Sequence, residues 1–337
     1  MSVSGTPAGY KAVSKLYNAL MTGMVLTLVT QRDAEAARRF VFTHFRRQHL
    51  EKFKDGLRKL GLDALPGAVA CAQYHYFSNA LGGVKTEYMP ESDKKAWVRY
   101  PPPRWIWSGA AICGIPREVN EAMLHGWHGH NGVTLGNPRL GFVCTGETVN
   151  GDPGLEGYYI EYDKEIAPDE RVRFVHHEHA PPFDPAKAPT LDSANWPEER
   201  LLKVERSYAM EYVRSMLPSM VELFGADDAA HLVGRTARLI GLQYYDECAR
   251  LLNVGGDRPV DFARMLAALA ASHGETVAVE DSTVTQTGSR LLYGVTNAHV
   301  MFDAWNALWT GMLAVHNRAL RLAVERHGEH IVWRVAP

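Results

Sequence analysis

The sequence has few cysteines and no arrangement that would pair them. Its four cysteines, at positions 71, 113, 144 and 248, form no Cys-x-x-Cys pair and no disulfide framework. Isolated thiols of this kind suit a reducing compartment. The N-terminal residues, MSVSGTPAGYK, also lack the charged and apolar regions of a secretory signal. We therefore expect a cytoplasmic protein.

An excess of one charge and a long apolar run are also missing. The chain of 337 residues carries 36 basic and 38 acidic side chains, a formal net charge of −2. This composition supplies no basic field for a phosphate backbone, so we expect no nucleic-acid partner. The longest apolar stretch, residues 19–29, has about half the length needed to cross a bilayer, and predicts a buried helix rather than a membrane partner.

Motifs that bind nucleotides or mark common hydrolases are absent too. The sequence contains no GxGxxG, Walker loop, GxSxG or HExxH motif. These absences disfavour nucleotide-dependent chemistry. We expect the partner to be a small-molecule substrate, with no cofactor or with one divalent metal ion.

An internal repeat is present. A shift of 182 positions places residues 122–147 on residues 304–329 with eight identities in twenty-six gapless positions, including the shared frame RLxxxxxGE. Self-similarity of this kind predicts a structural unit written twice. We expect a first α+β repeat over 10–166, a proline-rich linker over 167–198 with six prolines, and a second α+β repeat over 199–337.

Hydrophobic spacing predicts the same order of elements in each half. The first half reads as helices over 38–60 and 67–81, a hairpin within 84–100 with its turn at 90–93, a helix over 116–128, and strands near 139–145 and 157–163. The second half reads as helices over 204–224, 227–252 and 260–273, strands ETVAVED and SRLLYGV, a helix over 299–319 and a final hairpin. The predicted fold class is α+β, a tandem duplication with a pseudo-twofold axis.

The C-terminal half resembles a known family. The segments DFARMLAALAASHGETVAVED, SRLLYGV, HVMFDAWNALWTGMLAVHNRAL and RLAVERHGEHIVWRV look like the L-2-amino-thiazoline-4-carboxylic acid hydrolase family. That resemblance implies a small α+β domain related to vinyl-4-reductase-like ligand-binding domains. The Cys-Pro pair that such domains carry after the hairpin has no counterpart in TNAHVMF, so no cysteine nucleophile is carried over.

Residues 125–132, HGWHGHNG, hold three histidines, and the second copy of the repeat supplies their comparison. His125, His128 and His130 fall on Ala307, Thr310 and Met312, so packing alone does not require imidazoles at these positions. Three readings stay open. The histidines could hold a divalent metal with an open position, one or two of them could do metal-free acid–base chemistry, or they could be solvated residues at a helix end.

Other polar and aromatic residues of the first half are candidates for the same site. We expect catalytic roles for His128, His130, Glu147 and His75, because imidazoles and a carboxyl near the rim of a predicted sheet are groups that can do acid–base work. Flat apolar side chains and a cation suit the binding of a planar anionic substrate. The residues that we expect to supply them are Trp127, Tyr76, Trp105 and Arg104. The HHEH segment at 176–179 could join this site or be a solvated loop.

These observations favour a cytoplasmic hydrolase or lyase that acts on a small planar or aromatic molecule and forms a homodimer. His128 is the leading general acid or base. One alternative is a non-catalytic ligand-binding or sensor protein. The other is a metal-dependent hydrolase that uses His125, His128 and His130.

Overall fold

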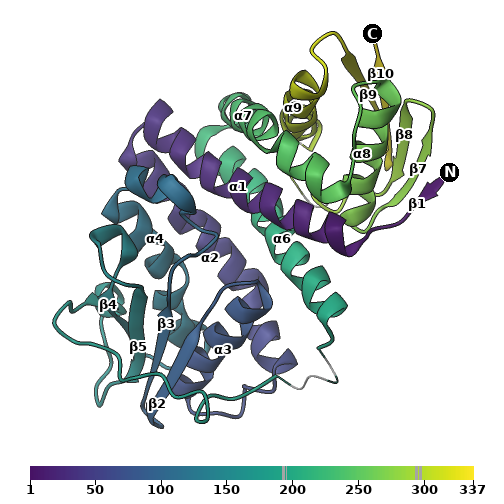
Figure 1. The fold of residues 1–337 in the computed structure, drawn as a ribbon. Coiled ribbons are helices and arrows are strands. Elements are labelled where there is room, and N and C mark those ends of the chain that lie inside the picture. The colour runs from purple at the N-terminus through teal and green to yellow at the C-terminus, as the bar shows by residue number, and fades with distance from the viewer. Residues whose placement is uncertain (192–193, 195, 293–294, 296–297) are drawn as a thin grey trace. The chain divides into compact units, whose positions relative to one another are not determined.

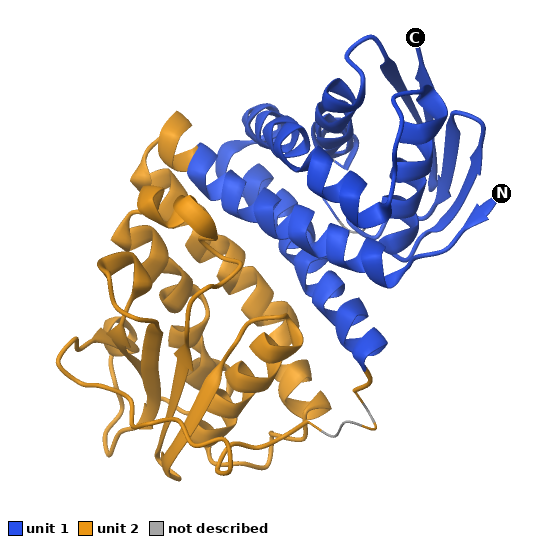
Figure 2. Cartoon of the chain, viewed as in Figure 1, with its two compact units in different colours: residues 1–27, 198–337 blue, residues 28–197 orange. Residues whose placement is uncertain are grey.

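The chain is an α+β protein built from two compact units. The computed structural model describes residues 1–191, 194, 196–292, 295 and 298–337. Unit 1 contains residues 1–27 and 198–337, and unit 2 contains residues 28–197 (Figure 2). Each unit holds one five-stranded sheet together with helices, so the predicted fold class is confirmed.

Unit 2 builds its sheet from two hairpins separated by a helix. Its elements are α2 (Ala34–Lys59), α3 (Gly67–Leu81), β2 (Glu87–Ser92), β3 (Lys95–Tyr100), α4 (Arg117–Gly126), a 3₁₀ turn (His128–His130), α5 (Asn131–Thr134), β4 (Leu140–Gly146), β5 (Leu155–Glu161) and β6 (Val172–Phe174). The strand order is β2-β3-β5-β4-β6. All neighbouring strands pair antiparallel except β4 and β6, which are parallel.

Both faces of the unit 2 sheet are covered. Helix α3 packs on β2, β3 and β5, and α2 packs on α4 (Figure 1). Because successive strand residues point to opposite faces, Tyr159 of β5 points toward the helices while Tyr158 joins an apolar cluster on the other face. Partly buried side chains of Val175, Ala180 and Phe183 pack on that second cluster. The segment after β6 therefore closes the sheet on the side away from the helices.

Unit 1 repeats the arrangement of hairpin, helix and hairpin. Its elements are β1 (Ser2–Val3), α1 (Pro7–Gln31, which continues past the unit boundary), α6 (Glu198–Phe224), α7 (Ala226–Leu252), α8 (Pro259–Ser272), β7 (Thr276–Glu280), β8 (Thr283–Thr287), α9 (Ala298–His316), β9 (Arg321–His327) and β10 (His330–Ala336). The strand order is β1-β7-β8-β10-β9, with antiparallel pairing throughout. Helix α8 packs on this sheet (Figure 1), and Trp333 of β10 is fully buried with its Nε1 donating to Asn306 Oδ1 at 2.8 Å.

The two halves have the same order of helices and strands, and the corresponding helices are similar in length. The three helices that precede the first hairpin have 25, 26 and 15 residues in the first half, and 27, 27 and 14 in the second. The strand order β2-β3-β5-β4 corresponds to β7-β8-β10-β9. This agreement is what the sequence repeat leads us to expect. An origin by duplication and the pseudo-twofold axis stay predictions.

The unit boundaries differ from the predicted domain boundaries of 10–166, 167–198 and 199–337. Residues 1–27 belong with the C-terminal half, because β1 pairs with β7 and Tyr17 of α1 lies 2.8 Å from His273 through its hydroxyl. Residues 167–197 belong to unit 2, because β6 extends its sheet beside β4. The pairing of β1 with β7 and that of β6 with β4 each join segments that are distant in sequence. No local sequence pattern predicts such a pairing.

Two local predictions also differ from the structure. The second strand of the hairpin in unit 1 is TVTQT at 283–287, and residues 290–292 of the apolar SRLLYGV form a turn, while 293 and 294 lie outside the described residues. In unit 2, β2 continues through Pro90 with an irregular register, so the hairpin turn falls at Asp93 and Lys94 rather than at 90–93.

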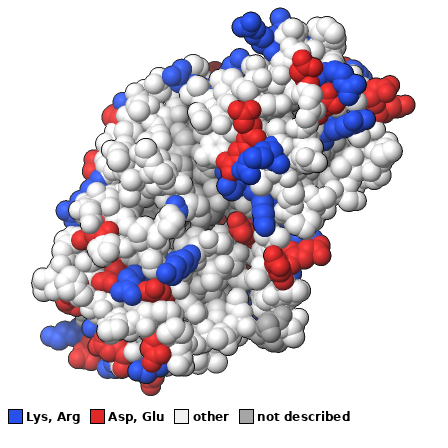
Figure 3. All heavy atoms as spheres, in the orientation of Figure 1, with Lys and Arg blue, Asp and Glu red and all other residues white. Residues whose placement is uncertain are grey.

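Helix α1 is the one described helix with the length and apolarity that crossing a membrane would require. Of its most apolar window, 67% is buried inside the structure, and Leu16, Leu20 and Met24 are fully buried. This burial confirms the prediction of a buried helix for residues 19–29. On the face in Figure 3, basic and acidic side chains are interspersed, as the balanced composition implies.

Two glycines of α7 test how closely α7 and α9 pack. A Cβ added at Gly241 would overlap the carbonyl oxygen of Leu308 in α9, whereas a Cβ added at Gly234 would have its nearest neighbour, Ala304, at 3.6 Å. We expect Gly241→Ala to destabilise the protein by about 1–3 kcal/mol, because the backbone must move apart. Gly234→Ala should stabilise it by up to about 1 kcal/mol through helix propensity. Urea unfolding of both variants gives the two free energies, and equal effects would contradict this packing.

Candidate active site

The end of strand β4 places a carboxyl group inside unit 2. The register of β4 against β5 shifts between Cys144 and Gly146, and the chain then turns through residues 148–150. Gly151 closes the turn in the left-handed region with a φ of 92°. The backbone N–H of Glu147 donates to Asp152 Oδ2 at 2.7 Å. This compact turn directs the Glu147 side chain toward α4.

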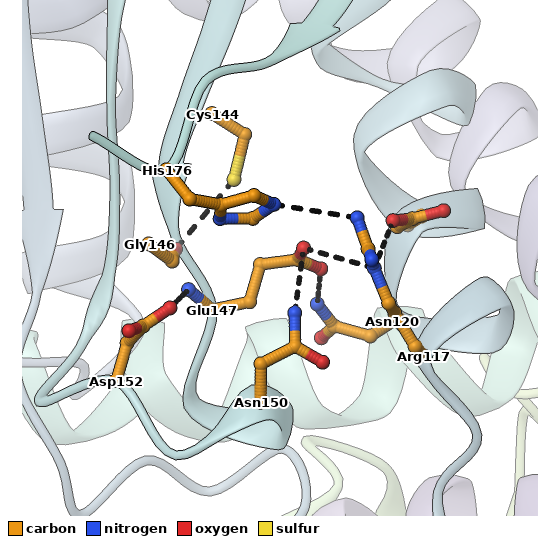
Figure 4. A network of polar contacts seen from close by, with 9 residues as sticks. Arg117, Asn120, Cys144, Gly146, Glu147, Asn150, Asp152 and His176 are labelled. Atoms are coloured by element: carbon orange, nitrogen blue, oxygen red, sulfur yellow. Dashed lines mark hydrogen bonds and ion pairs between the residues drawn. The ribbon is translucent and has the colours of Figure 1, made fainter. Parts of the chain in front are cut away.

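The carboxyl of Glu147 is held by two amides. Asn120 Nδ2 donates to Oε1 at 2.9 Å, and Asn150 Nδ2 donates to Oε2 at 3.1 Å. Arg117 Nε lies 3.7 Å from Oε2, so the carboxyl lies between the amides and the guanidinium (Figure 4). Glu147 is 0% exposed. We call Arg117, Asn120, Glu147, Asn150 and His176 the Glu147 site.

Opposing effects set the pKa of Glu147. Burial raises it most, the hydrogen bond from Asn120 lowers it, the neighbouring charge of Glu121 raises it, and Arg117 and His176 lower it. The net result is a pKa above the ordinary value of 4.5. A carboxyl shifted in this direction retains its proton closer to neutral pH and can serve as a proton donor there.

Arg117 connects the Glu147 carboxyl to an exposed histidine. Arg117 of α4 donates from Nε to Glu121 Oε1 at 2.6 Å, and its side chain is 49% exposed. Its Nη2 lies 3.3 Å from Nε2 of the exposed His176. Because a guanidinium can only donate, Nε2 of His176 is the acceptor in this contact. The first residue of HHEH therefore joins the site, whereas His177 and His179 are exposed beyond the end of β6.

A strained tryptophan orients one of the two amides. Trp107 has a φ of 58°, a left-handed conformation that is an outlier for a bulky residue. Its buried Nε1 donates to Asn120 Oδ1 at 2.9 Å. With that oxygen accepting from the indole, Asn120 must present its NH₂ group to Glu147. Trp107 is therefore a positioning residue for the carboxyl.

Cys144 lies near this site as an unreactive thiol. It is fully buried, and its Sγ donates to the Gly146 carbonyl at 3.5 Å. Burial, followed by the charge of Glu147, raises the pKa of the thiol far above its usual range. Since the thiolate is the nucleophile, Cys144 supplies none at neutral pH.

A second cluster, the buried histidine network, lies between α2, α3 and the sheet, and consists of His49, His75, His128, Asn131 and Tyr159. The Tyr159 hydroxyl lies 2.6 Å from His128 Nδ1 and accepts from Asn131 Nδ2 at 2.8 Å. The same Asn131 nitrogen lies 3.2 Å from His75 Nε2. The rings of His75 and His128 stack with centroids 4.1 Å apart.

These bonds and the burial keep the imidazoles neutral. Since Asn131 donates to the Tyr159 oxygen, Tyr159 donates its proton to His128 Nδ1, and His128 carries its own proton on Nε2. Burial lowers the pKa of His128 to about 3, with a further contribution from Arg104, and burial likewise lowers the pKa of His49 to about 3. Burial also lowers the pKa of His75 well below its ordinary value.

The three histidines of HGWHGHNG do not come together. His128 points into the buried histidine network, while the ring of His125 lies 5.9 Å from that of Phe174. His130 Nδ1 lies 2.9 Å from the His125 carbonyl oxygen. Within the described parts of the chain, no group of three or more His, Cys, Asp or Glu side chains is placed to hold a metal ion. The structure thus offers no support for the proposed three-histidine metal site.

The predicted substrate-binding residues lie in several elements of unit 2. Trp127 stacks on Tyr74 with centroids 6.3 Å apart and borders the buried histidine network, and the half-buried Arg104 lies over the ring of Tyr100 at 5.3 Å. Tyr76 lies on α3 beside Tyr88, and Trp105 is half-buried in the loop before α4. Of the predicted catalytic residues, only His75 and His128 are in contact.

Sequence reasoning missed most partners of Glu147. Arg117, Asn120 and Asn150 are ordinary polar residues of a helix and a turn, with no spacing that marks them. The asparagine before Gly151 was the available signal, because Asn-Gly pairs favour turns.

No family model, curated protein or solved structure matches the chain. The resemblance of the C-terminal half to the L-2-amino-thiazoline-4-carboxylic acid hydrolase family therefore stays a prediction.

The neutral imidazoles predict a specific loss of stability in acid. The pKa of His128 is about 3 in the folded protein, whereas the ordinary value for a histidine is 6.5. The unfolded chain therefore takes up a proton that the folded one does not, and stability present above pH 6.5 is lost as the pH falls toward 3. Between pH 7 and pH 5 this loss amounts to about 2 kcal/mol for one such group.

His128→Gln keeps an acceptor for Tyr159 but does not titrate. We expect its free energy of unfolding to fall by about 2 kcal/mol less than that of the unchanged protein between pH 7 and pH 5. Urea unfolding at both pH values measures the difference. If the free energy of unfolding fell by the same amount in both proteins between pH 7 and pH 5, His128 would not be held neutral in the folded protein.

Proposed function

We propose that the protein is a hydrolase or lyase for a small planar molecule and that Glu147 is its proton-transfer group. The observation that carries this proposal is the Glu147 carboxyl itself. It is completely buried, burial raises its pKa, and the partly exposed Arg117 lies 3.7 Å from it and 3.3 Å from the exposed His176.

The groups around the carboxyl suit acid–base catalysis. With a raised pKa, Glu147 donates a proton to a leaving group, and the amides of Asn120 and Asn150 stabilise the carboxylate that remains. The same carboxylate then takes a proton from water or from carbon, as hydrolysis and elimination respectively require. Arg117 supplies a cation for a developing negative charge or for an anionic substrate group.

The neighbouring groups favour Glu147 over His128 for this role, because the side chain of Arg117, which lies 3.7 Å from the Glu147 carboxyl, is 49% exposed. His128 is hydrogen-bonded to the buried Tyr159 and His75 lies 3.2 Å from the buried Asn131, and both rings are almost completely buried. Arg117 is half-exposed and lies 5.9 Å from the ring of Phe174, so an aromatic surface adjoins the cation. This arrangement suits a planar anion, and the proposed reaction uses no cofactor.

A substrate screen tests the proposed function. The protein is incubated with planar heterocyclic carboxylic acids and amides, including 2-amino-thiazoline-4-carboxylic acid, and mass spectrometry detects the gain of water or the loss of a fragment. For a converted compound, Glu147→Gln should lower kcat about a hundred- to ten-thousand-fold, the range for a lost acid–base group. The matched control is Glu165→Gln, which changes an exposed carboxylate and should leave kcat unchanged.

Asn150→Ala removes one amide donor from the carboxyl and should move the basic limb of the kcat–pH profile to higher pH, because the ionised form of Glu147 loses a hydrogen bond. Circular dichroism confirms that each variant is folded. Conversion at the original rate by Glu147→Gln would place the active site elsewhere. Saturable binding without conversion would favour the alternative of a ligand-binding protein.

We also propose a cytoplasmic homodimer. The thiols of Cys71, Cys144 and Cys248 are buried, and Cys113 is exposed and free, which a reducing compartment tolerates. Twofold dimers are the commonest assemblies of soluble enzymes. Light scattering at micromolar concentration should give twice the mass of 37.5 kDa, and a mass equal to one chain would contradict the dimer.

A further inference from the structure

Three basic side chains of unit 2 come from segments that lie against one another. Arg46 comes from α2, His130 from the 3₁₀ turn after α4, and Arg171 from the residue before β6. All three side chains are half-buried. They belong to three different elements, so the packing of unit 2 and not a single flexible loop sets their positions.

Two glycines of HGWHGHNG make this convergence possible. A Cβ at Gly126 would lie 2.7 Å from the Phe42 carbonyl oxygen and 3.2 Å from the backbone nitrogen of Arg46. A Cβ at Gly129 would lie 2.9 Å from Val172 Cγ2 and 3.9 Å from the Cβ of Arg171. The turn that carries His130 therefore lies directly against α2 on one side and against the start of β6 on the other.

The cations have neutral partners or none. Arg46 Nη1 donates to His49 Nδ1 at 2.7 Å, and His130 Nδ1 donates to the His125 carbonyl oxygen at 2.9 Å. Across the described ranges, no carboxylate forms an ion pair with Arg46, Arg171 or His130. Arg173, two residues from Arg171, is by contrast paired with Glu170 at 2.5 Å.

The like charges repel one another. Burial and the charge of Arg171 lower the pKa of Arg46. Burial, followed by the charge of Arg46, lowers the pKa of His130, and Arg171 lowers it further. The two half-buried arginines, which lack a counter-ion, are costly to bury because water solvates them only in part. An anion between them would remove that cost and accept several charge-assisted hydrogen bonds.

We propose that Arg46, His130 and Arg171 form a binding site for an oxyanion, a phosphate or carboxylate group of a small molecule. The site is separate from the Glu147 site and does not depend on the proposed reaction. Because Arg46 donates to His49, a bound oxyanion is also linked through one hydrogen bond to the buried histidine network.

Calorimetric titration of the full-length protein at constant ionic strength tests the site. Inorganic phosphate and acetate are titrated separately, and the two arms distinguish a phosphate site from a carboxylate site. We expect saturable binding of at least one of them. Arg171→Gln should weaken it about tenfold or more, because a charge-assisted hydrogen bond is lost. The matched control, Arg173→Gln, removes a cation that is already paired and should leave Kd within about twofold.

Measuring the anion affinity at several pH values tests the role of His130 separately from the net charge of the protein. A bound anion raises the pKa of His130, so the affinity should increase as the pH falls through the titration of this imidazole. His130→Gln should abolish most of that increase while the variant stays folded by circular dichroism. Absence of saturable binding for both anions would overturn the proposal. Equal weakening in Arg171→Gln and Arg173→Gln would overturn it as well.

Discussion

The close approach of the segment 126–132 to its neighbours is the constraint on which both sites of unit 2 depend. Gly126 lies against the α2 backbone and Gly129 lies against Val172, while a Cβ at Gly132 would come within 2.5 Å of the Leu140 carbonyl oxygen. Any side chain at these positions would push the turn away from α2, β4 or β6. With the turn held in place, His128 reaches Tyr159 and His130 reaches Arg46, and α4 keeps Asn120 beside Glu147.

A comparison of the two units separates the demands of packing from the demands of chemistry. A buried tyrosine–histidine pair is not peculiar to unit 2, because Tyr17 and His273, and Tyr245 and His316, make the same bond in unit 1 at 2.8 and 2.7 Å. Such pairs let a protein bury two polar groups that satisfy each other. Glu147 differs from the residue that the predicted repeat aligns with it. Its counterpart in the repeat, Glu329, is exposed in the β9–β10 turn. The difference between the copies is therefore in the carboxylate more than in the imidazoles.

Local pattern was sufficient for most helices and hairpins, because amphipathic spacing and turn residues act within a few positions. It failed where a distant segment decides the outcome. SRLLYGV is apolar enough for a strand, but the polar TVTQT pairs with both β7 and β10 and takes the place in the sheet. The pairing of β1 with β7 likewise spans most of the chain. The Glu147 site was found only in part, since its carboxyl was predicted and its amide partners depend on an irregular register after Cys144.

The conformation of Trp107 connects backbone strain to the chemistry of Glu147. Holding a bulky residue at a φ of 58° costs about 1–3 kcal/mol, and such strain persists only where surrounding contacts determine it. Here the buried indole and its bond to Asn120 supply those contacts. The same bond prevents the Asn120 amide from turning its oxygen toward the carboxylate, which would repel it. Strain in the loop thus fixes a donor beside the buried carboxyl for which we propose the loss and recovery of a proton.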